Sequence, residues 1–402
     1  MKKHQSRFSL LCAFTVFLFA LGCDKEMPVT PPDTPEPVAE ATTTDVPDFT
    51  KIFAAIEQSG GVIERDANGN VNGVNLAAER TSVTDDVLKQ ALLVPDLKSL
   101  RVAGSNLSAE AFADLAKQSK LETLFLQGVP LADEELEHVV SAVPSLRRLT
   151  LRRLNGVSDA GIIAVLQHSQ LRSLALIEMN LTRAALEKIA ESPDLAALDL
   201  RHCSRLTPED YELLASMKRL SDLKIGGFAV NDAVLKTLPS LPQLRGLAIE
   251  ESAMTAEGFT ELASHENWAS KLELLVLSRN TALWDATLNS LRTFQGLKRL
   301  TVRDMMVSGE FLKALVETES IRTKLEQLAL PKTYLNDENA GELKKCSQLK
   351  RLDLSYNMVT EEILKTVAEV KTLENLDLTG CQLDDATLEQ AKKMRCQVNL
   401  PH

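Results

Sequence analysis

Leucines recur along most of the chain in one pattern, LxxLxL, at intervals of 24, 25 or 28 residues. The fourth and sixth positions have the two-residue spacing that points strand side chains to one face, so each copy predicts a short strand buried on one side. One such strand cannot cover its own apolar face, and regular copies therefore favour stacking into a continuous core. The pattern starts at Leu97, Leu121, Leu146, Leu171, Leu195, Leu220, Leu244, Leu272, Leu297, Leu325, Leu349 and Leu373.

A segment with helical spacing follows each copy of the pattern. A further apolar residue comes first, and in ten of the twelve copies the residue after it is Ser, Thr, Asn or Asp, the types that cap helix N-termini. The two exceptions are Ala132 and Trp284. Apolar residues then recur three or four positions apart, as at Leu186 and Ile189. Each unit therefore predicts a strand, a tight turn and a capped helix.

This arrangement resembles the leucine-rich repeat family, in the subtype with a full helix per repeat, from about residue 71 onward. The resemblance implies an α/β fold: a right-handed solenoid, or horseshoe, with a parallel concave sheet and convex helices. We assign twelve repeats to residues 97–395. The family often has a buried Asn or Cys three residues after the last strand leucine. Only Cys203, Asn280, Asn357 and Cys381 match that position, so we expect no continuous asparagine ladder and interpret both cysteines as core residues.

Segments on both sides of the repeats are predicted to cap the apolar ends of the solenoid. Residues 49–96 combine an amphipathic helix, a hairpin around an Asn-Gly turn and a degenerate first repeat. Residues 396–402 supply a last strand. The two 28-residue intervals carry their extra residues near 264–271 and 316–324, at the end of the outer helix. We expect these insertions to lengthen the convex side without interrupting the sheet.

The N-terminus has the layout of an export signal. Basic residues precede an apolar run of 14 residues, Phe8–Leu21, which is shorter than the roughly 20 residues that a membrane span needs. The run ends in FALGC, which resembles the lipobox of bacterial lipoproteins, although Ala20 stands where that family most often has Leu. The resemblance implies a signal peptide at 1–22, cleavage after Gly22 and a lipid on Cys23. The alternative is an ordinary secretory signal with an incidental Cys23.

Residues 23–48 are rich in proline, threonine and acids, and they predict a disordered tether because they offer little to bury. At about 3.1 Å per residue in a polyproline conformation, this tether would reach roughly 70 Å from a bilayer. Together with lipid attachment at Cys23, it indicates an exported protein held at a membrane of the bacterial cell envelope, on the periplasmic side or at the cell surface.

Charge and motifs disfavour several classes of function. The sequence carries 56 Asp and Glu against 45 Lys and Arg, a formal net charge of −11, whereas a nucleic-acid-binding protein needs a basic face. It contains no GxSxG nucleophile motif, no glycine-rich phosphate loop and no HExxH motif. We therefore predict no enzymatic activity, cofactor, metal site or nucleic-acid partner. His202, beside Cys203 and near Asp199, is interpreted as a surface histidine next to a charged neighbour.

The concave face is the remaining candidate surface, because outward strand residues of successive repeats form rows about 4.8 Å apart. Arginines concentrate in the third to fifth repeats and predict a local basic patch, with apolar residues exposed nearby. Arginine and exposed aromatic residues are typical of interface centres. The predicted partner-binding residues are Phe125, Arg148, Thr150, Arg152, Arg172, Ile177, Asp199, Arg201, Lys224, Leu274 and Val276.

An ordinary solvated face is the alternative interpretation of these rows. In that case Arg153–Glu178 and Asp199–Lys224 are cross-strand ion pairs, each worth under about 1 kcal/mol. The charges would then stabilise the sheet modestly and recognise no partner.

These features together predict a monomeric, lipid-anchored bacterial envelope protein whose concave face binds a partner, either a protein or a glycan. Fold alone does not give function, so the class of partner rests on analogy. Two alternatives remain open. The first is an intracellular adaptor, because the helix-bearing repeats also resemble those of F-box substrate receptors. The second is a structural envelope protein with no dedicated ligand.

Overall fold

The computed structural model describes residues 48–78 and 81–400, so the predicted signal peptide, Cys23 and nearly all of the tether lie outside the described residues. The described strands form one sheet in chain order, in which β1 and β2 are antiparallel and the later neighbours are parallel. The strands are β1 (Val62–Arg65), β2 (Val71–Leu76), β3 (Ser99–Ala103), β4 (Thr123–Gln127), β5 (Arg148–Arg152), β6 (Ser173–Ile177), β7 (Ala197–Asp199), β8 (Asp222–Gly227), β9 (Gly246–Ser252), β10 (Leu274–Ser278), β11 (Arg299–Arg303), β12 (Gln327–Ala329), β13 (Arg351–Asp353), β14 (Asn375–Asp377) and β15 (Gln397–Asn399).

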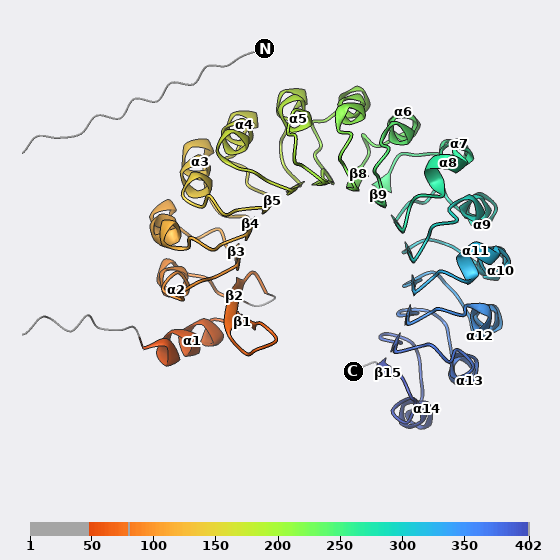
Figure 1. Ribbon diagram of the computed structural model, residues 1–402. Helices are drawn as coiled ribbons and strands as arrows, with labels where there is room; N and C mark the ends of the chain where they lie inside the picture. Colours follow the sequence, from red (N-terminus) through yellow and green to blue (C-terminus); the bar gives the residue numbers. More distant parts are fainter. Residues whose placement is uncertain (1–47, 79–80, 401–402) are drawn as a thin grey trace, which may run out of the picture. The chain divides into compact units, whose positions relative to one another are not determined.

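Helices connect successive strands and lie on the outer side of an open curve, while the strands line its inner side (Figure 1). The α-helices are α1 (Phe49–Gln58), α2 (Asp85–Ala91), α3 (Asp133–Ser141), α4 (Asp159–His168), α5 (Arg183–Ala190), α6 (Asp232–Thr237), α7 (Ala256–Ser264), α8 (Glu266–Ala269), α9 (Asp285–Leu288), α10 (Gly309–Glu317), α11 (Glu319–Arg322), α12 (Asp337–Ala340), α13 (Glu362–Ala368) and α14 (Asp385–Ala391). The 3-10 helices are η1 (Ala109–Lys117), η2 (Pro208–Ser216), η3 (Leu238–Ser240), η4 (Asn289–Thr293) and η5 (Gly341–Lys345).

The prediction of an α/β leucine-rich repeat solenoid with a parallel concave sheet is confirmed. The expectation of a full α-helix in every repeat is wrong. In two repeats the helix is η1 or η2 throughout, and α6, α9 and α12 continue directly into η3, η4 and η5. Apolar spacing does not separate the two helix types, because residues three apart lie on one face in both.

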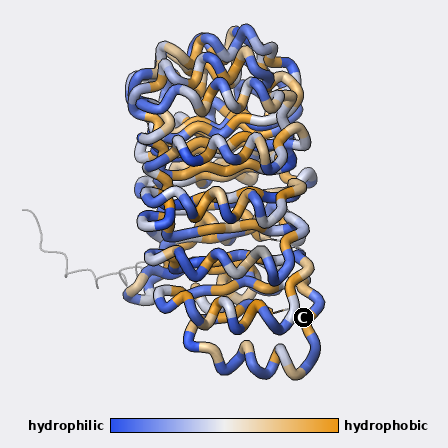
Figure 2. The backbone as a smooth tube through the Cα atoms, turned by 90° about the vertical axis from the view of Figure 1, so that its right-hand side faces the viewer, coloured by the Kyte–Doolittle hydropathy of each residue, from blue (hydrophilic) through white to orange (hydrophobic). Residues whose placement is uncertain are grey.

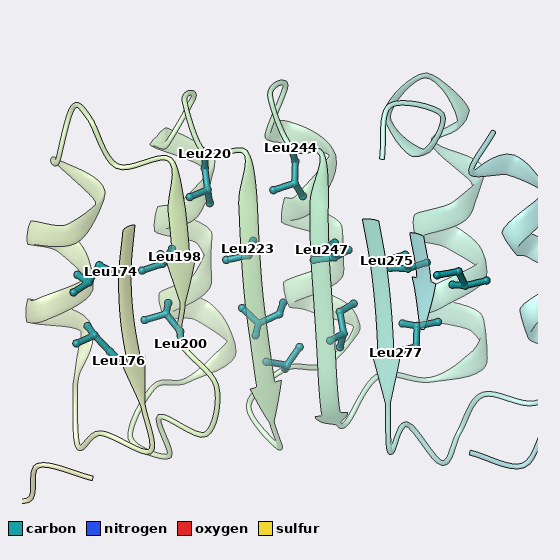
Figure 3. Close-up of a cluster of buried hydrophobic side chains, with 14 of the residues drawn as sticks. Leu174, Leu176, Leu198, Leu200, Leu220, Leu223, Leu244, Leu247, Leu275 and Leu277 are labelled. Carbon is teal, nitrogen blue, oxygen red and sulfur yellow. The ribbon is translucent and has the colours of Figure 1, made fainter. Parts of the chain in front are cut away.

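The repeated leucines form the interior. Leu198, Leu223 and Leu247 are in direct register on neighbouring strands, and each is at most 2 % exposed. Figure 3 shows them in one row across the sheet. Hydrophobic positions recur at corresponding places in successive turns (Figure 2). Each fully buried leucine contributes about 1.5–3 kcal/mol, so stacking, rather than the local preference of such short strands, stabilises the fold.

Aspartates at helix starts also link neighbouring repeats, a role that the sequence pattern did not indicate. The Asp232 carboxylate accepts hydrogen bonds from the backbone amide and the hydroxyl of Thr255, both at 2.7 Å. Asp133 binds Ser158 in the same way, at 2.7 and 2.6 Å. Each carboxylate thereby ties the first turn of one helix to the residue that precedes the next. The same link joins Asp85 to Ser108, Asp159 to Thr182, Asp285 to Ser308 and Asp337 to Thr360.

Two buried asparagines hold loops after the strands. Asn357 accepts hydrogen bonds from the amides of Thr333 and Leu335 at 2.9 and 3.1 Å, and donates to the Leu330 carbonyl at 2.6 Å. Asn280 likewise accepts from the amide of Ser252, the last residue of β9, and donates to the Ile249 carbonyl of the same strand. These side chains satisfy buried backbone groups that would otherwise be left without partners.

Short caps lie at both ends of the sheet. Helix α1 begins at a capping residue, Asp48, which accepts from the amides of the first turn, and it buries Ile52 and Ile56. Strand β1 then forms a hairpin with β2, whose Val74 and Leu76 are fully buried in register with β3. At the other end, β15 pairs in parallel with β14.

The predicted extra residues of the two long repeats form the short helices α8 and α11, which directly follow the outer helices α7 and α10. The sheet continues through both repeats without a break, as predicted. Within the described residues, no helix is both long and apolar enough to cross a bilayer.

Candidate partner-binding surfaces

Outward side chains of the concave face lie in the predicted rows. Thr150 is in register with Phe125 on one side and Ala175 on the other. Asp199 is likewise in register with Lys224. Nine of the eleven predicted partner-binding residues belong to strands, whereas Arg172 lies just before β6 and Arg201 lies two residues after β7. The rows therefore form one continuous surface across the sheet.

Glu178 binds two arginines of the predicted basic patch at once. Its carboxylate accepts hydrogen bonds from Nε and Nη2 of Arg152 at 3.0 and 2.7 Å, and from Nη2 of Arg153 at 3.1 Å. Arg153 and Glu178 directly follow β5 and β6 in a left-handed conformation, with φ of 54° and 55°. The hydrogen bond from Arg153, followed by those from Arg152, lowers the pKa of Glu178 to about 2. The predicted Arg153–Glu178 pair is confirmed.

Arg201 is bound on both sides by carboxylates. Its Nε and Nη2 donate to Asp199 at 3.0 and 2.8 Å, and its Nη1 donates to Glu250 at 2.7 Å. The predicted Asp199–Lys224 pair is therefore wrong. The planar guanidinium of Arg201 holds both oxygens of the nearly buried Asp199, while Lys224 stays exposed to water. The Asp199 and Glu250 carboxylates raise the pKa of Arg201.

Glu250 also binds a second arginine, Arg279. Arg279 donates to its carboxylate through Nη2 at 2.5 Å and reaches Glu251 at 3.4 Å. Burial opposes ionisation of Glu250, but Arg201 and Arg279 outweigh that effect and hold its pKa below the ordinary value. The concave face therefore carries a chain of alternating charges across β7, β9 and the turn after β10.

Gly226 lies next to the backbone of Glu250, between the two repeats that the Arg201–Glu250 ion pair joins. It is in register with Glu250. A Cβ atom there would meet the Glu250 carbonyl oxygen at 2.4 Å. Arg201 and Glu250 line a hollow of ≈ 490 Å³ together with Arg152, Ile177 and Arg279.

The predicted basic patch is consequently not a field of uncompensated positive charge. Arg152, Arg153 and Arg201 are all paired with carboxylates. Arg148 and Arg172 are exposed and form no ion pair among the described residues. Arg148 donates from Nε to the Thr123 hydroxyl at 2.9 Å. These two arginines are the ones that remain available to an anionic group.

The predicted apolar positions of the concave face are half-buried. The guanidinium of Arg101 lies over the Phe125 ring at 4.3 Å, a cation–π contact that covers part of the ring. Ile177 borders the hollow beside Arg201. Leu274 borders a smaller hollow of ≈ 230 Å³ toward β11, and Val276 is half-buried next to Ala248 and Thr301.

A second surface, which the sequence pattern did not predict, lies in the loops that follow β10 to β13. We call it the rim patch, because parallel strands end at one edge of the sheet. Its members are large apolar residues that are each more than half exposed: Trp284, Met306, Tyr334, Tyr356 and Met358. Trp284, Met306 and Tyr334 line a mainly apolar hollow of ≈ 630 Å³. The only sequence signal for it was Trp284, one of the two residues at a capping position that cannot cap.

Phe228 is also exposed, at 85 %, although it occupies the position where the family often has a buried Asn or Cys. The strand pairing of β8 with β9 is irregular between Gly226 and Gly227, and Gly227 has a positive φ of 94°. The shifted register is particular to this pair of neighbouring strands, and Phe228 directly follows it. Apart from the two adjacent glycines, nothing in the repeat pattern indicated the irregularity.

Two buried cysteines and His202 lie near the concave face. Cys203 is buried, its thiol donates to the Leu176 carbonyl, and burial raises its pKa to about 12. Cys381 is buried in the same way, so both are core residues as predicted. His202 is half-buried at the edge of the concave hollow. In the part of the chain that the structure describes, no three His, Cys, Asp or Glu residues are grouped to hold a metal ion.

No protein-family model matches the chain. Among curated proteins it is similar to NLR family CARD domain-containing protein 4 of Xenopus tropicalis, with 23 % identity over 313 residues. The match covers 70 % of this chain and 31 % of the relative, so the chain spans less than a third of that protein's length.

Solved structures with a similar fold include a chain in the yeast complex of Rad7 and Elc1, with a TM-score of 0.61 and 20 % identity. That match covers 79 % of this chain and 83 % of the other. An internalin of Listeria monocytogenes matches with a TM-score of 0.45 and 18 % identity, over 81 % of this chain and 86 % of the other. At such identities the likeness to the Rad7–Elc1 chain shows the fold, a leucine-rich repeat solenoid.

Proposed function

We propose that the chain is an exported, lipid-anchored protein of the bacterial cell envelope whose concave face binds a protein partner. Support for export and lipid anchoring comes from the sequence: an apolar run of signal-peptide length, a lipobox-like FALGC and a proline-rich segment before the repeats. Support for partner binding comes from the solenoid fold, which offers an extended concave surface and is used in a protein complex by the chain from the Rad7–Elc1 structure.

One observation carries the proposed binding surface: the arginines of the concave face are held in fixed geometry by neighbouring carboxylates. Arg152 and Arg201 each donate two or more hydrogen bonds within the sheet. A partner therefore would not have to order these long side chains, and ordering costs about 0.5–1.5 kcal/mol per side chain. Arg148 and Arg172 add unpaired positive charge beside this ordered region. A glycan is the alternative ligand, bound through the same polar groups.

The test reverses charge only at the unpaired arginines, because substitution of Arg201 would leave the buried Asp199 without a cation and Glu250 with Arg279 alone. Full-length R148E/R172E and a matched double reversal on outer helices, K89E/K313E, are each used to capture partners from envelope extract. We expect mass spectrometry to find a protein with wild type and K89E/K313E that is lost with R148E/R172E. Equal recovery by all three chains would reject this surface, and a complete lack of captured protein would favour the structural envelope protein.

The proposed anchor is tested separately at Cys23. In bacteria expressing the full chain, we expect a mature N-terminus that starts at an acylated Cys23, and accumulation of the uncut precursor in the presence of globomycin, which inhibits lipoprotein signal cleavage. The C23S chain is the control and is expected to stay unacylated. A mature chain cut elsewhere and free of acyl groups would overturn the lipid anchor and leave the concave-face proposal standing.

An intracellular adaptor is the second candidate, and the similarity to a chain in the Rad7–Elc1 complex favours it. This role would use the same repeats as a substrate receptor and would not need export. Cell fractionation discriminates between the two, since recovery of an uncut, soluble cytosolic chain would support the adaptor and contradict the envelope protein.

A further inference from the structure

The rim patch leaves apolar area uncovered at one edge of the solenoid. Its five members are among the eight large hydrophobic residues that are exposed in the described part of the chain, and they follow four consecutive strands. Trp284, Met306 and Tyr334 converge on one hollow of ≈ 630 Å³. Soluble monomers rarely expose contiguous apolar patches of this kind unless something binds there.

The chain keeps these aromatic residues where local structure favours other types. Trp284 occupies the N-cap position of α9 and makes no capping hydrogen bond, whereas ten of the twelve repeats have a capping residue there. Tyr334 has a φ of 62°, the left-handed region that suits Asn or Gly. Breaks of local rules cluster at functional sites, so the aromatic side chains have a role other than stabilising these loops.

Tyr356 is also held in place by its neighbour. A Cβ atom at Gly380 would come within 2.4 Å of the Tyr356 ring, so the ring lies against a glycine of the next repeat. The ring remains 61 % exposed. The patch is therefore a positioned surface of aromatic and methionine side chains, the residue types that dominate peptide-binding interfaces.

Acidic residues surround the patch. Asp285 and Asp304 line the hollow itself. At the starts of the helices after the next three loops, Glu310, Glu338 and Glu361 are exposed and form no ion pair among the described residues. Of the basic residues near these loops, Lys332 pairs with Asp304 at 3.0 Å and Arg279 pairs with Glu250, whereas Arg303 is exposed and forms no ion pair among the described residues, so acids outnumber bases here. The surroundings of the apolar hollow are thus electronegative.

We propose that the rim patch binds a peptide segment of a partner protein that carries aromatic or aliphatic anchors flanked by lysine or arginine. The anchors enter the hollow between Trp284, Met306 and Tyr334, and the basic residues face the acids at the helix starts. An anionic bilayer is the competing occupant for exposed Trp and Tyr, but the surrounding acids repel it. This second surface stands apart from the concave face and does not depend on the function proposed for that face.

Two substitutions remove the aromatic groups and agree with local structure. W284S introduces a preferred capping residue, and Y334N places a residue that tolerates the left-handed conformation. The full-length W284S/Y334N chain is therefore expected to fold with an unchanged or higher melting temperature. L93S is the matched control, because Leu93 is also an exposed apolar residue but lies before β3, away from these loops. R148E/R172E shows whether a probe binds to the concave face instead.

The probe is a displayed library of random short peptides, selected on the immobilised full chain with counter-selection on W284S/Y334N. We expect the enriched peptides to combine Lys or Arg with apolar anchors. Their affinity should be the same for wild type, L93S and R148E/R172E, and about tenfold or more weaker for W284S/Y334N. Replacing Lys and Arg of an enriched peptide by Glu should abolish binding.

Each other outcome overturns the proposal. Absence of enrichment, enriched peptides without basic residues, or equal binding by W284S/Y334N would remove the basic-peptide site, and loss in R148E/R172E alone would assign the peptides to the concave face. The membrane is tested with vesicles of phosphatidylcholine, with and without phosphatidylglycerol. We expect no change in tryptophan emission, since a blue shift in wild type that disappears in W284S would assign the rim patch to a lipid surface.

Discussion

The concave face around β5 to β9 and the rim patch after β10 to β13 present opposite kinds of surface. On the concave face, Glu178 binds Arg152, and Asp199 and Glu250 bind Arg201, so these charged side chains are held in ion pairs within the sheet. In the rim patch, Trp284 and Tyr334 are each more than half exposed among the described residues.

This difference separates side chains that stabilise the solenoid from side chains that are available to a partner. The ion pairs themselves can be explained by the fold, so the concave-face proposal rests on the ordered geometry that they give the arginines and on the unpaired Arg148 and Arg172. An aromatic residue that replaces a helix cap makes no stabilising contact of this kind in the described part of the chain. The sequence pattern indicated the concave arginines as the main partner-binding residues. The structure adds the exposed aromatic residues of the rim patch as candidates.

The largest expected effect comes from the buried asparagine beneath the rim patch. N357A removes the acceptor that holds the amides on both sides of Tyr334 and leaves several buried backbone groups without partners. We expect a loss of about 3 kcal/mol or more in unfolding free energy, measured by urea denaturation. N180A, which changes the same group at an exposed loop position, is expected to have almost no effect. Similar losses in both variants would contradict the supporting role of Asn357.

A smaller loss of unfolding free energy is expected when Gly226 is replaced by alanine. G226A places a Cβ atom 2.4 Å from the Glu250 carbonyl oxygen, so the neighbouring strand must shift. We expect a destabilisation of about 2 kcal/mol in the same urea assay. G341A is the control, because a Cβ atom at Gly341 meets nothing within 4 Å. An unchanged stability of G226A would show that the strand carrying Glu250 accommodates a side chain at this position without cost.

The ion pairs of Glu178 predict a pH dependence. Its pKa is about 2 in the folded chain and 4.5 ordinarily, so these ion pairs stabilise the fold above about pH 4.5, and that contribution is lost as the pH falls toward 2. E178Q should therefore lower the unfolding free energy at pH 7 by about 1 kcal/mol, after allowance for solvent screening, and approach wild type near pH 2. A constant difference between the two chains from pH 7 to 2 would argue against the ion pairs.

The smallest expected effect is an increase, not a decrease, in the free energy of unfolding. W284S and Y334N should each raise the unfolding free energy by about 0.5–1 kcal/mol, because each suits its local backbone better than the native aromatic residue. Thermal unfolding followed by circular dichroism measures the gain. If both variants are instead strongly destabilised, the aromatic side chains support the fold, and their exposure needs no partner to explain it.

Much of the fold was predictable because it depends on repeated positions. The intervals between leucines indicated the strands and their register, which places Leu198, Leu223 and Leu247 in one buried row. The helix type was not predictable, since α and 3-10 helices share the three-residue spacing.

The candidate site was less predictable because it depends on single side chains and on their directions. Asp199 bonds to Arg201 two residues away instead of to Lys224 directly across the sheet, a choice that side-chain reach and burial decide and that strand register cannot reveal. The rim patch depends on how far each loop residue is exposed. Spacing shows that Tyr334 and Tyr356 follow strands, but only the folded loops show that both point into solvent.

Oxidative footprinting of the full chain tests the central claim most directly, because the sequence contains two tryptophans in opposite environments. Trp284 is 53 % exposed in the rim patch, whereas Trp268 is 6 % exposed. We predict that hydroxyl radicals oxidise Trp284 and Met306 much faster than Trp268 in the unbound chain, and that a selected basic peptide protects the first two alone. Slow oxidation of Trp284 in the unbound chain, or rapid oxidation that the bound peptide leaves unchanged, would contradict the account.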